Sequence, residues 1–233
     1  MTQQALKPAR VLICDLDGTL IDSVPDLTSA VGDLLAEVGR PPLPLVAVRR
    51  MVGDGIATLV ERALIASGGV PVATEMAGYV ARYSTFYEER MTELTRPYPH
   101  VVETLSDLKD AGWRLAICSN KPEQPCRHVL AVLGLEHLFE AVAGGDTFTT
   151  RKPDPGPVRG VLDRLGATPG EAIMFGDSHN DVLAARAAGL PVIAIASGYG
   201  PVPPRDLAAD ILIDTVAELP DALATIARPG PLA

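Results

Sequence analysis

VLICDLDGTL, at residues 11–20, decides the fold of this chain of 233 residues. Its first four residues are apolar and predict a short buried strand. Asp15 and Asp17 follow at once, where the strand gives way to a Gly-Thr turn. Because an unpaired buried carboxylate is costly, something must keep this pair ionised, and a divalent cation is the simplest candidate. A carboxylate held in this way can attack a phosphorus atom while its neighbour moves a proton.

The composition is that of a globular protein, with 47% hydrophobic residues, 21% charged residues and a formal net charge of −9. A chain this acidic offers no electrostatic footprint for nucleic acid or for an anionic membrane surface. An anionic substrate must therefore be attracted by a local group, such as a metal ion or a placed lysine. We expect the partner to be a small phosphorylated metabolite, and the protein to be a monomer or homodimer.

The three cysteines show no CxxC spacing, and Cys14 and Cys118 fall in expected core strands. Buried thiols and a reducing compartment are therefore expected, rather than a disulfide framework. Residues 1–10 lack the apolar core of a signal peptide, and no stretch approaches the roughly 20 apolar residues of a membrane span. We expect a cytoplasmic protein whose last residues, 228–233, fray.

Short apolar runs alternate with helical stretches, which predicts an α/β fold with a doubly wound, mostly parallel sheet. The runs lack a clean alternation, as strands covered on both faces do. The expected strands are Val11–Cys14, Arg114–Cys118, Ala141–Ala143, Glu171–Phe175, Pro191–Ala196 and Ile211–Ile213. The expected helices each stop at a glycine, and they span Val101–Ala111, Cys126–Leu133, Val158–Leu165 and Asp181–Ala188.

From about residue 21 to residue 98 the sequence shows helical periodicity and no strand pattern. Helices are expected from about 23 to 39, from about 55 to 64 and from about 72 to 91. A parallel crossover needs only about a dozen residues. We therefore predict a helical cap domain at residues 21–96, inserted into a Rossmann-like core domain at residues 1–20 and 97–233. The proline-rich segments 41–44 and 97–99 are the expected joints, and such a cap can exclude water from the site.

Polar residues follow four of the expected strands, at the edge of the sheet where α/β proteins place their sites. Besides Asp15 and Asp17, they are Ser119-Asn120-Lys121, Arg151-Lys152-Pro153-Asp154 and Gly176-Asp177-Ser178-His179-Asn180-Asp181. Phosphoryl transfer spreads negative charge over three oxygens. Ser119 and the backbone N–H groups after Asp15, beginning with that of Leu16, can donate to them, and Lys152 can neutralise them.

Asp15 is the expected nucleophile, and Mg²⁺ between Asp15 and Asp177 would remove the repulsion between these two carboxylates. Asp17 is expected to give the metal a backbone oxygen and to use its side chain as the general acid and base. Structural alternatives remain open. Asp177 could also be the N-cap of the next helix, with Asp181 in its first turn. Lys121 could close a surface turn, and Asn120 could cap a helix.

These stretches, in this order, resemble the motifs of the haloacid dehalogenase superfamily over nearly the whole chain. DLDGTL is similar to its first motif, Ser119 to the second, Lys152 to the third and GDSHND to the fourth. The DxD form indicates the phosphatase branch, and the cap is similar to the helical C1 type. VGDG at 52–55, NKP at 120–122 and GGDTFTTRKPDPGP at 144–157 resemble phosphoglycolate phosphatases. This implies Mg²⁺-dependent hydrolysis of 2-phosphoglycolate to glycolate and phosphate through an aspartyl-phosphate.

The resemblance also favours substrate-binding roles for Asn120 and for the cap loop Gly53-Asp54-Gly55, which could otherwise be a plain turn between helices. Arg50 or Arg62 could meet a substrate carboxylate. Two other functions stay open. One is a phosphosugar phosphatase or β-phosphoglucomutase-like enzyme of the same architecture. The other is a catalytically silent binding or regulatory module, although no catalytic group is missing.

Overall fold

The computed structural model describes residues 10–70 and 72–226, so the expected fraying of 228–233 lies outside the described part. Its centre is a six-stranded sheet in the order β5-β4-β1-β6-β7-β8, and every neighbouring pair is parallel. This confirms the predicted doubly wound α/β fold. The strands are β1 (Arg10–Cys14), β4 (Trp113–Cys118), β5 (Phe139–Ala143), β6 (Ala172–Gly176), β7 (Val192–Ile195) and β8 (Ile211–Ile213).

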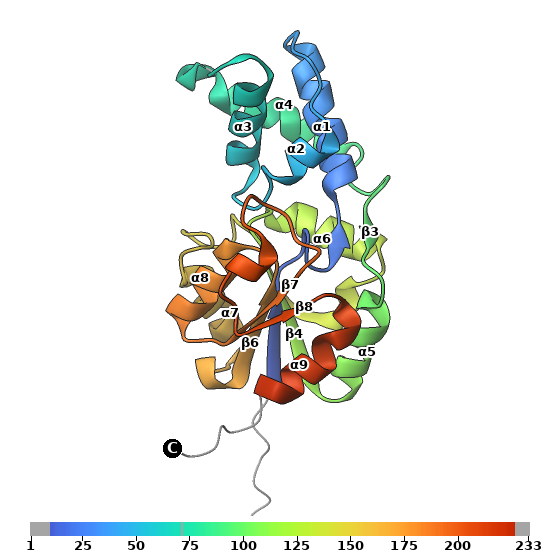
Figure 1. The fold of residues 1–233 in the computed structure, drawn as a ribbon, viewed down its shortest axis with the longest axis vertical. Coiled ribbons are helices and arrows are strands. Elements are labelled where there is room, and N and C mark those ends of the chain that lie inside the picture. The colour runs from blue at the N-terminus through green and yellow to red at the C-terminus, as the bar shows by residue number, and fades with distance from the viewer. Residues whose placement is uncertain (1–9, 71, 227–233) are drawn as a thin grey trace, which may run out of the picture.

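Helices cover both faces of this sheet, with α7 and α8 on one side and α5 and α9 on the other (Figure 1). Side chains of strand β1 pack on both faces of the sheet. Leu12 and Cys14 belong to the buried cluster on one face, and Val11 and Ile13 belong to the cluster on the other. The covering helices are α5 (Val101–Asp110), α6 (Glu123–Val132), α7 (Gly156–Leu165), α8 (His179–Ala188) and α9 (Leu219–Ile226). Short 3₁₀ helices span Ala73–Glu75, Glu136–Leu138, Pro169–Glu171, Pro204–Asp206 and Val216–Glu218.

The strand order reverses at β1, because the chain adds β4 and β5 on one side of it and β6 to β8 on the other. Such a switch point opens a crevice at the carboxyl ends of the strands. Cys14 pairs with Phe175, and the backbone N–H of Asp15 donates to the Phe175 carbonyl at 2.9 Å. The loops that carry Asp15 and Asp177 therefore leave the sheet side by side.

A bundle of helices stands beyond this edge of the sheet (Figure 1). Helix α1 packs against α2, α3 and α4, and α3 packs against α4. Their apolar faces belong to one buried cluster that continues into one layer of the core sheet, and the rings of Tyr83 and Tyr87 stack with centroids 6.1 Å apart. The helices are α1 (Val24–Glu37), α2 (Leu45–Arg49), α3 (Ile56–Gly68) and α4 (Met76–Glu88).

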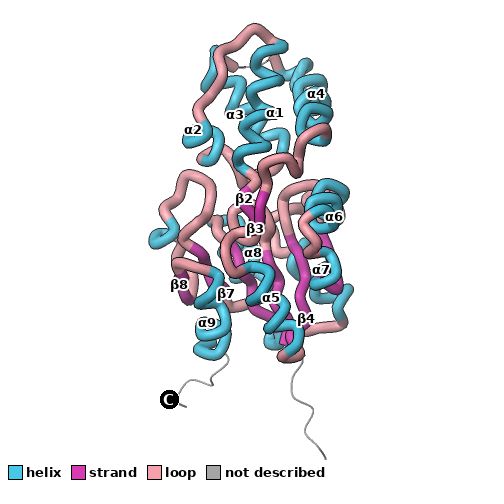
Figure 2. Tube along the Cα trace, turned by 90° about the vertical axis from the view of Figure 1, so that its right-hand side faces the viewer, coloured by secondary structure: helices cyan, strands magenta, loops and turns pink. Residues whose placement is uncertain are grey.

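The chain enters and leaves this bundle through a two-stranded antiparallel ladder, β2 (Ile21–Asp22) with β3 (Arg96–Pro97). Figure 2 shows the ladder between the bundle and the sheet. The sequence showed no strand pattern here, because two residues are too few for a periodicity. Since Ile21 pairs with Pro97, we keep residues 21–96 as the proposed cap domain and the 97–99 segment as one proposed joint.

The expected joint at 41–44 is wrong, because this segment lies within the bundle, between α1 and α2. Helix α2 was not predicted, since five residues cannot display a helical period. The remaining differences concern element ends. Glu171 closes a 3₁₀ turn instead of starting β6, and the third cap helix is split into a 3₁₀ turn and α4.

Asp26 ties the first cap helix to the returning chain. Its buried carboxylate accepts the N–H groups of Leu94 and Thr95 at 2.8–3.1 Å and the Thr95 hydroxyl at 2.7 Å. We predict that Asp26→Ala lowers the free energy of unfolding by about 3 kcal/mol, because buried donors lose their acceptor. Urea unfolding measures this. Glu37→Ala, which breaks the exposed pair with Arg82, is the control and should change little. Equal losses in the two variants would contradict this role for Asp26.

Candidate active site

Three buried carboxylates meet at the carboxyl ends of the central strands. Asp15 follows β1, Asp177 follows β6, and Asp181 lies in the first turn of α8. One oxygen from each can be chosen so that all three atoms lie within 4.8 Å of one another. The structure thus brings Asp15 and Asp177 together as the sequence predicts, and it adds Asp181.

Lys152 is the buried cation of this cluster. Its Nζ donates to Asp15 Oδ1 at 2.9 Å, to Asp181 Oδ1 at 2.5 Å and to the Cys118 carbonyl at 2.5 Å. Burial disfavours an ammonium, but Asp15 and Asp181 more than compensate, so the pKa of Lys152 is raised and it stays charged. With all three carboxylates in the ionised form, one lysine would leave two excess negative charges, which a divalent cation would balance.

The excess of negative charge also affects the pKa values of Asp15 and Asp177. Burial raises the pKa of Asp15 to about 6, although the Lys152 ammonium offsets part of the rise. Burial, followed by the charge of Asp15, also raises the pKa of Asp177. A cation between these groups would remove the repulsion and favour their ionised forms.

Asp177 is held in place by groups from two loops. The Thr19 hydroxyl donates to Oδ1 at 2.7 Å, and the Tyr199 N–H donates to Oδ2 at 2.7 Å. Gly18 is required between them because its φ is +88° and a Cβ there would lie 2.6 Å from Asp177 Oδ2. The glycine of the DLDGTL stretch therefore makes room for the carboxylate of another strand.

The N-cap of α8 is Ser178, so the expectation that Asp177 caps this helix is wrong. Asp181, three residues further on, completes a capping box with Ser178. Its Oδ2 accepts the Ser178 N–H and hydroxyl at 3.0 and 2.7 Å, while its Oδ1 binds Lys152. Asp181 is thus both part of the helix cap and a member of the acidic cluster.

The side chain of Asp17 turns away from the acidic cluster. Its Oδ1 accepts the Ser23 hydroxyl at 2.6 Å, and both of its oxygens lie 3.1 Å from Lys121 Nζ. Lys121 is buried and also donates to the Tyr87 hydroxyl of α4 at 2.6 Å, so the surface-turn alternative for Lys121 is wrong. The sequence signalled Lys121 by its place two residues after Ser119 and within NKP, but not its contacts, because its partners come from distant segments.

The predicted hydrogen bonds from Ser119 and from the Leu16 N–H to phosphoryl oxygens stay predictions. Ser119 is buried at the end of β4, and its N–H donates to the Ala143 carbonyl at 3.0 Å. Leu16 has a buried side chain, and its carbonyl accepts the N–H groups of the turn, from Thr19, Leu20 and Ile21. Its predicted part in substrate binding concerns only its own N–H.

The cap loop at residues 53–55 touches the core directly. Asn120 Nδ2 donates to the Gly53 carbonyl at 2.9 Å and to the Lys152 carbonyl at 2.8 Å, which replaces the helix-capping alternative for Asn120. Asn180 Nδ2 donates to the Gly53 carbonyl at 3.1 Å and to Asp54 Oδ1 at 2.7 Å.

The Asp54 carboxylate also pairs with Arg62 at 2.6 Å. The pocket at Asp15, Ser119 and Lys152 is lined by Gly53 and Gly55 of this loop. It is not lined by Asp54, Arg50 or Arg62.

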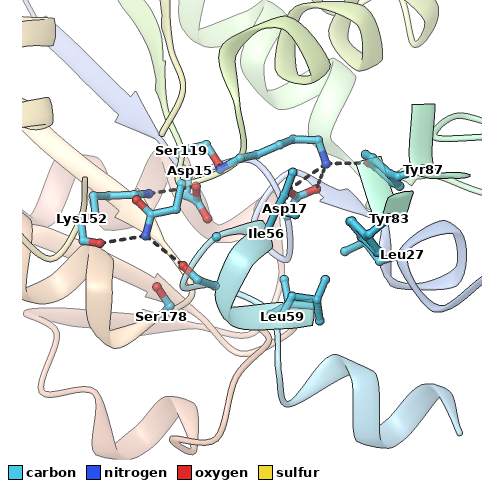
Figure 3. A pocket seen from close by; sticks show the side chains of 15 residues that line it. Asp15, Asp17, Leu27, Ile56, Leu59, Tyr83, Tyr87, Ser119, Lys152 and Ser178 are labelled. Atoms are coloured by element: carbon cyan, nitrogen blue, oxygen red, sulfur yellow. Dashed lines mark hydrogen bonds and ion pairs between the residues drawn. The ribbon is translucent and has the colours of Figure 1, made fainter. Parts of the chain in front are cut away.

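A pocket lies between the strand ends and the cap and contains about 570 Å³ of empty space, part of it open to solvent (Figure 3). Its core end is polar, with Asp15, Ser119 and Lys152. Its cap end is largely apolar. The full lining is Asp15, Asp17, Leu27, Val52, Gly53, Gly55, Ile56, Leu59, Tyr83, Tyr87, Ser119, Asn120, Lys121, Lys152 and Ser178.

Comparison with known proteins agrees with this geometry. Residues 12–195 match the profile of the family described as haloacid dehalogenase-like hydrolase. The phosphoglycolate phosphatases of Caulobacter vibrioides and Rhodospirillum rubrum are 40% and 42% identical, and each alignment covers 91% of this chain and 90% of the relative. The crystal structure of a predicted phosphoglycolate phosphatase from Haemophilus somnus superposes with a TM-score of 0.88 at 30% identity. It covers 94% of this chain and 99% of that one.

The chain belongs to the haloacid dehalogenase-like hydrolase family, which confirms the predicted superfamily and an enzyme of the hydrolase class. Within residues 10–70 and 72–226, no helix is both long and apolar enough to cross a membrane. All three cysteines are free and buried, and the burial of Cys14 and Cys118 was expected.

Gly18 offers a test of the packing around Asp177. We predict that Gly18→Ala lowers the free energy of unfolding by more than Gly39→Ala does. Both glycines have positive φ, which costs an alanine about 1–2 kcal/mol, but a Cβ at Gly39 meets nothing within 4 Å. The clash with Asp177 should add at least about 1 kcal/mol at Gly18. Urea unfolding of both variants measures the difference, and equal losses would contradict the close approach.

Proposed function

We propose that this hydrolase cleaves small phosphate monoesters through an aspartyl-phosphate on Asp15, with 2-phosphoglycolate as substrate. The observation that carries the proposal is the buried set of Asp15, Asp177, Asp181 and Lys152 at the switch point of the sheet. Asp15, the proposed nucleophile, and Lys152, the cation for the phosphoryl oxygens, line one end of the pocket. The acidic cluster that includes Asp15 has a charge imbalance that suits a divalent cation. The named activity of the relatives supports the choice of substrate.

The residues at the polar end divide the work on the phosphoryl group. Asp15 would attack phosphorus, and Lys152, which already touches Asp15, would neutralise the equatorial oxygens. Ser119 and the N–H of Leu16 would donate hydrogen bonds to the same oxygens. Asp15, Leu16 and Ser119 directly follow strands β1 and β4, and Lys152 is held by the Cys118 carbonyl and by Asp181. Little reorganisation is therefore needed when the ester binds.

Asp17 would protonate the leaving oxygen and then take a proton from the attacking water. Its carboxylate is separate from the acidic cluster and is oriented by Ser23 and Lys121. The first of these lies where the chain enters the cap, and the second bonds to Tyr87 of the cap. The orientation of the proposed acid and base therefore depends on the position of the cap.

We propose Mg²⁺ as the cation held by Asp15, Asp177 and the backbone oxygen of Asp17, with Asp181 beside them. Buried carboxylate oxygens form the hard donor set that Mg²⁺ prefers. When bound, the cation supplies charge neutralisation between the nucleophile and the anionic phosphoryl group. The acidic chain and its three free thiols also support a cytoplasmic enzyme acting on a small metabolite. A monomer or homodimer remains our expectation for its oligomeric state.

The test of the proposed activity is a screen of phosphate esters that includes 2-phosphoglycolate and hexose phosphates. We predict the highest kcat/KM for 2-phosphoglycolate. Asp15→Asn should reduce turnover at least about 10³-fold, because the amide cannot act as the nucleophile. The variant Asp163→Asn, on the surface of α7, is the control and should keep full activity. A preference for hexose phosphates would replace the substrate, and an active Asp15→Asn would refute the nucleophile.

The raised pKa of Asp15 predicts a pH-dependent effect of Mg²⁺ on stability. Without a cation, the pKa of Asp15 is about 6 in the folded protein and 3.8 in the unfolded chain. Between these two pH values the folded protein therefore holds a proton that the unfolded chain has released. This stabilisation is present below pH 3.8 and is lost as pH rises through about 6. Mg²⁺ competes with the proton, so it should raise the Tm more at about pH 7.5 than at about pH 5. Thermal unfolding with and without Mg²⁺ measures this.

Asp15→Asn, which has no such proton, is the control for the pH effect. Mg²⁺ should raise the Tm of this variant less than it raises the Tm of the wild type. The rise should also differ less between the two pH values, because residue 15 no longer exchanges a proton. A wild-type response that is equal at both pH values would contradict the proposed cation site.

A further inference from the structure

Tyr83 of α4 carries an unexplained polar group. Its side chain is fully buried and lines the pocket, yet its hydroxyl has no hydrogen-bond partner among the described residues. Leaving a buried hydroxyl unpaired costs free energy, and proteins rarely do so without a reason. Burial raises the pKa of Tyr83, so the group stays protonated and can donate.

The unpaired hydroxyl is a donor that a ligand in the pocket can use. Among the lining residues, Asn120 Oδ1 is the other buried atom without a partner, but an amide oxygen can only accept. The Tyr83 ring stacks on Tyr87, and apolar Leu27 lines the pocket with them. Its position is therefore set by packing rather than by a hydrogen bond.

Lys121 places a positive charge at the same end of the pocket. Figure 3 shows Tyr83, Tyr87 and Asp17 on one side of the pocket, with Lys152 on the opposite side. Lys121 Nζ donates to the Tyr87 hydroxyl and to Asp17, and an ammonium has three N–H groups. One of them can turn to a ligand, because Ser23 continues to hold Asp17.

The pocket is thus built for two anionic groups. Lys152 and Ser119 define the phosphoryl end, while Lys121 and the Tyr83 hydroxyl define a second end at the cap. We infer that Lys121 and Tyr83 bind a carboxylate on the leaving group of the substrate. This inference rests on the proposed function and adds to it the residues that select for a carboxylate. A substrate that uses both ends must carry its second anion on the leaving group.

Recognition by this pair would be selective. A carboxylate oxygen accepts from a phenol and from an ammonium, whereas an alkyl group would leave the Tyr83 hydroxyl unpaired. The low local polarity that Leu27, Ile56 and Leu59 create strengthens a charge-assisted hydrogen bond. An ester without the carboxylate would bind through its phosphoryl group alone.

The test compares 2-phosphoglycolate with ethyl phosphate, which has the same two-carbon skeleton without the carboxylate. Tyr83→Phe removes only the hydroxyl and keeps the ring stack, so the fold should be unaffected. We expect kcat/KM for 2-phosphoglycolate to fall about tenfold and that for ethyl phosphate to stay within about twofold. In the Asp15→Asn background, calorimetry should show the same weakening of 2-phosphoglycolate binding.

The matched control is Tyr79→Phe, the same change on the same helix. The Tyr79 hydroxyl bonds to Glu75 at the surface, so this variant should change neither substrate. Tyr83 is chosen over Lys121 because replacing Lys121 would also free Asp17 and slow both substrates.

The outcomes separate the two proposals. Wild-type protein that hydrolyses 2-phosphoglycolate no better than ethyl phosphate would overturn the proposed substrate and this inference together. A wild-type preference that survives in Tyr83→Phe would overturn this inference alone. Equal losses for both substrates would also overturn it, because they would indicate damage to the phosphoryl end.

Discussion

The contact of Lys152 with Asp15 and Asp181, beside Asp177, is the constraint on which the rest of the structure depends. Buried like charges can persist only where a cation and fixed donors compensate them. The compensation comes from Lys152, from Thr19, from the backbone of Tyr199 and from the capping box of α8. The carboxyl edge of the sheet is therefore arranged around charge, while the two layers below it are apolar.

The sheet topology explains why these groups can meet. Because the strand order reverses at β1, the loops after β1 and β6 diverge from neighbouring strands without a helix between them. Gly18 then permits the close approach of Asp177, since any Cβ there would collide with its carboxylate. Backbone conformation, strand order and electrostatics thus act on the same few atoms.

The cap contributes to the site through contacts as well as through cover. Gly53 accepts from Asn120 and Asn180 of the core, and Tyr87 accepts from Lys121. Since Lys121 also holds Asp17, the proposed proton-transfer group is connected to α4 by two hydrogen bonds. Cap position and the geometry of the acid and base are in this way linked through one buried lysine.

The sequence by itself determined the parallel α/β fold, the helical insertion and the carboxylates at the strand tips, because apolar periodicity and strand-end motifs are local patterns. Only the tertiary structure decided the ladder of Ile21 with Pro97 and the burial of Lys121. These depend on partners far apart in the chain: Lys121 meets Asp17 across 104 residues and Tyr87 across 34. A local sequence pattern shows which residue is present, but the charged group or hydroxyl that pairs with that residue comes close only when the chain folds.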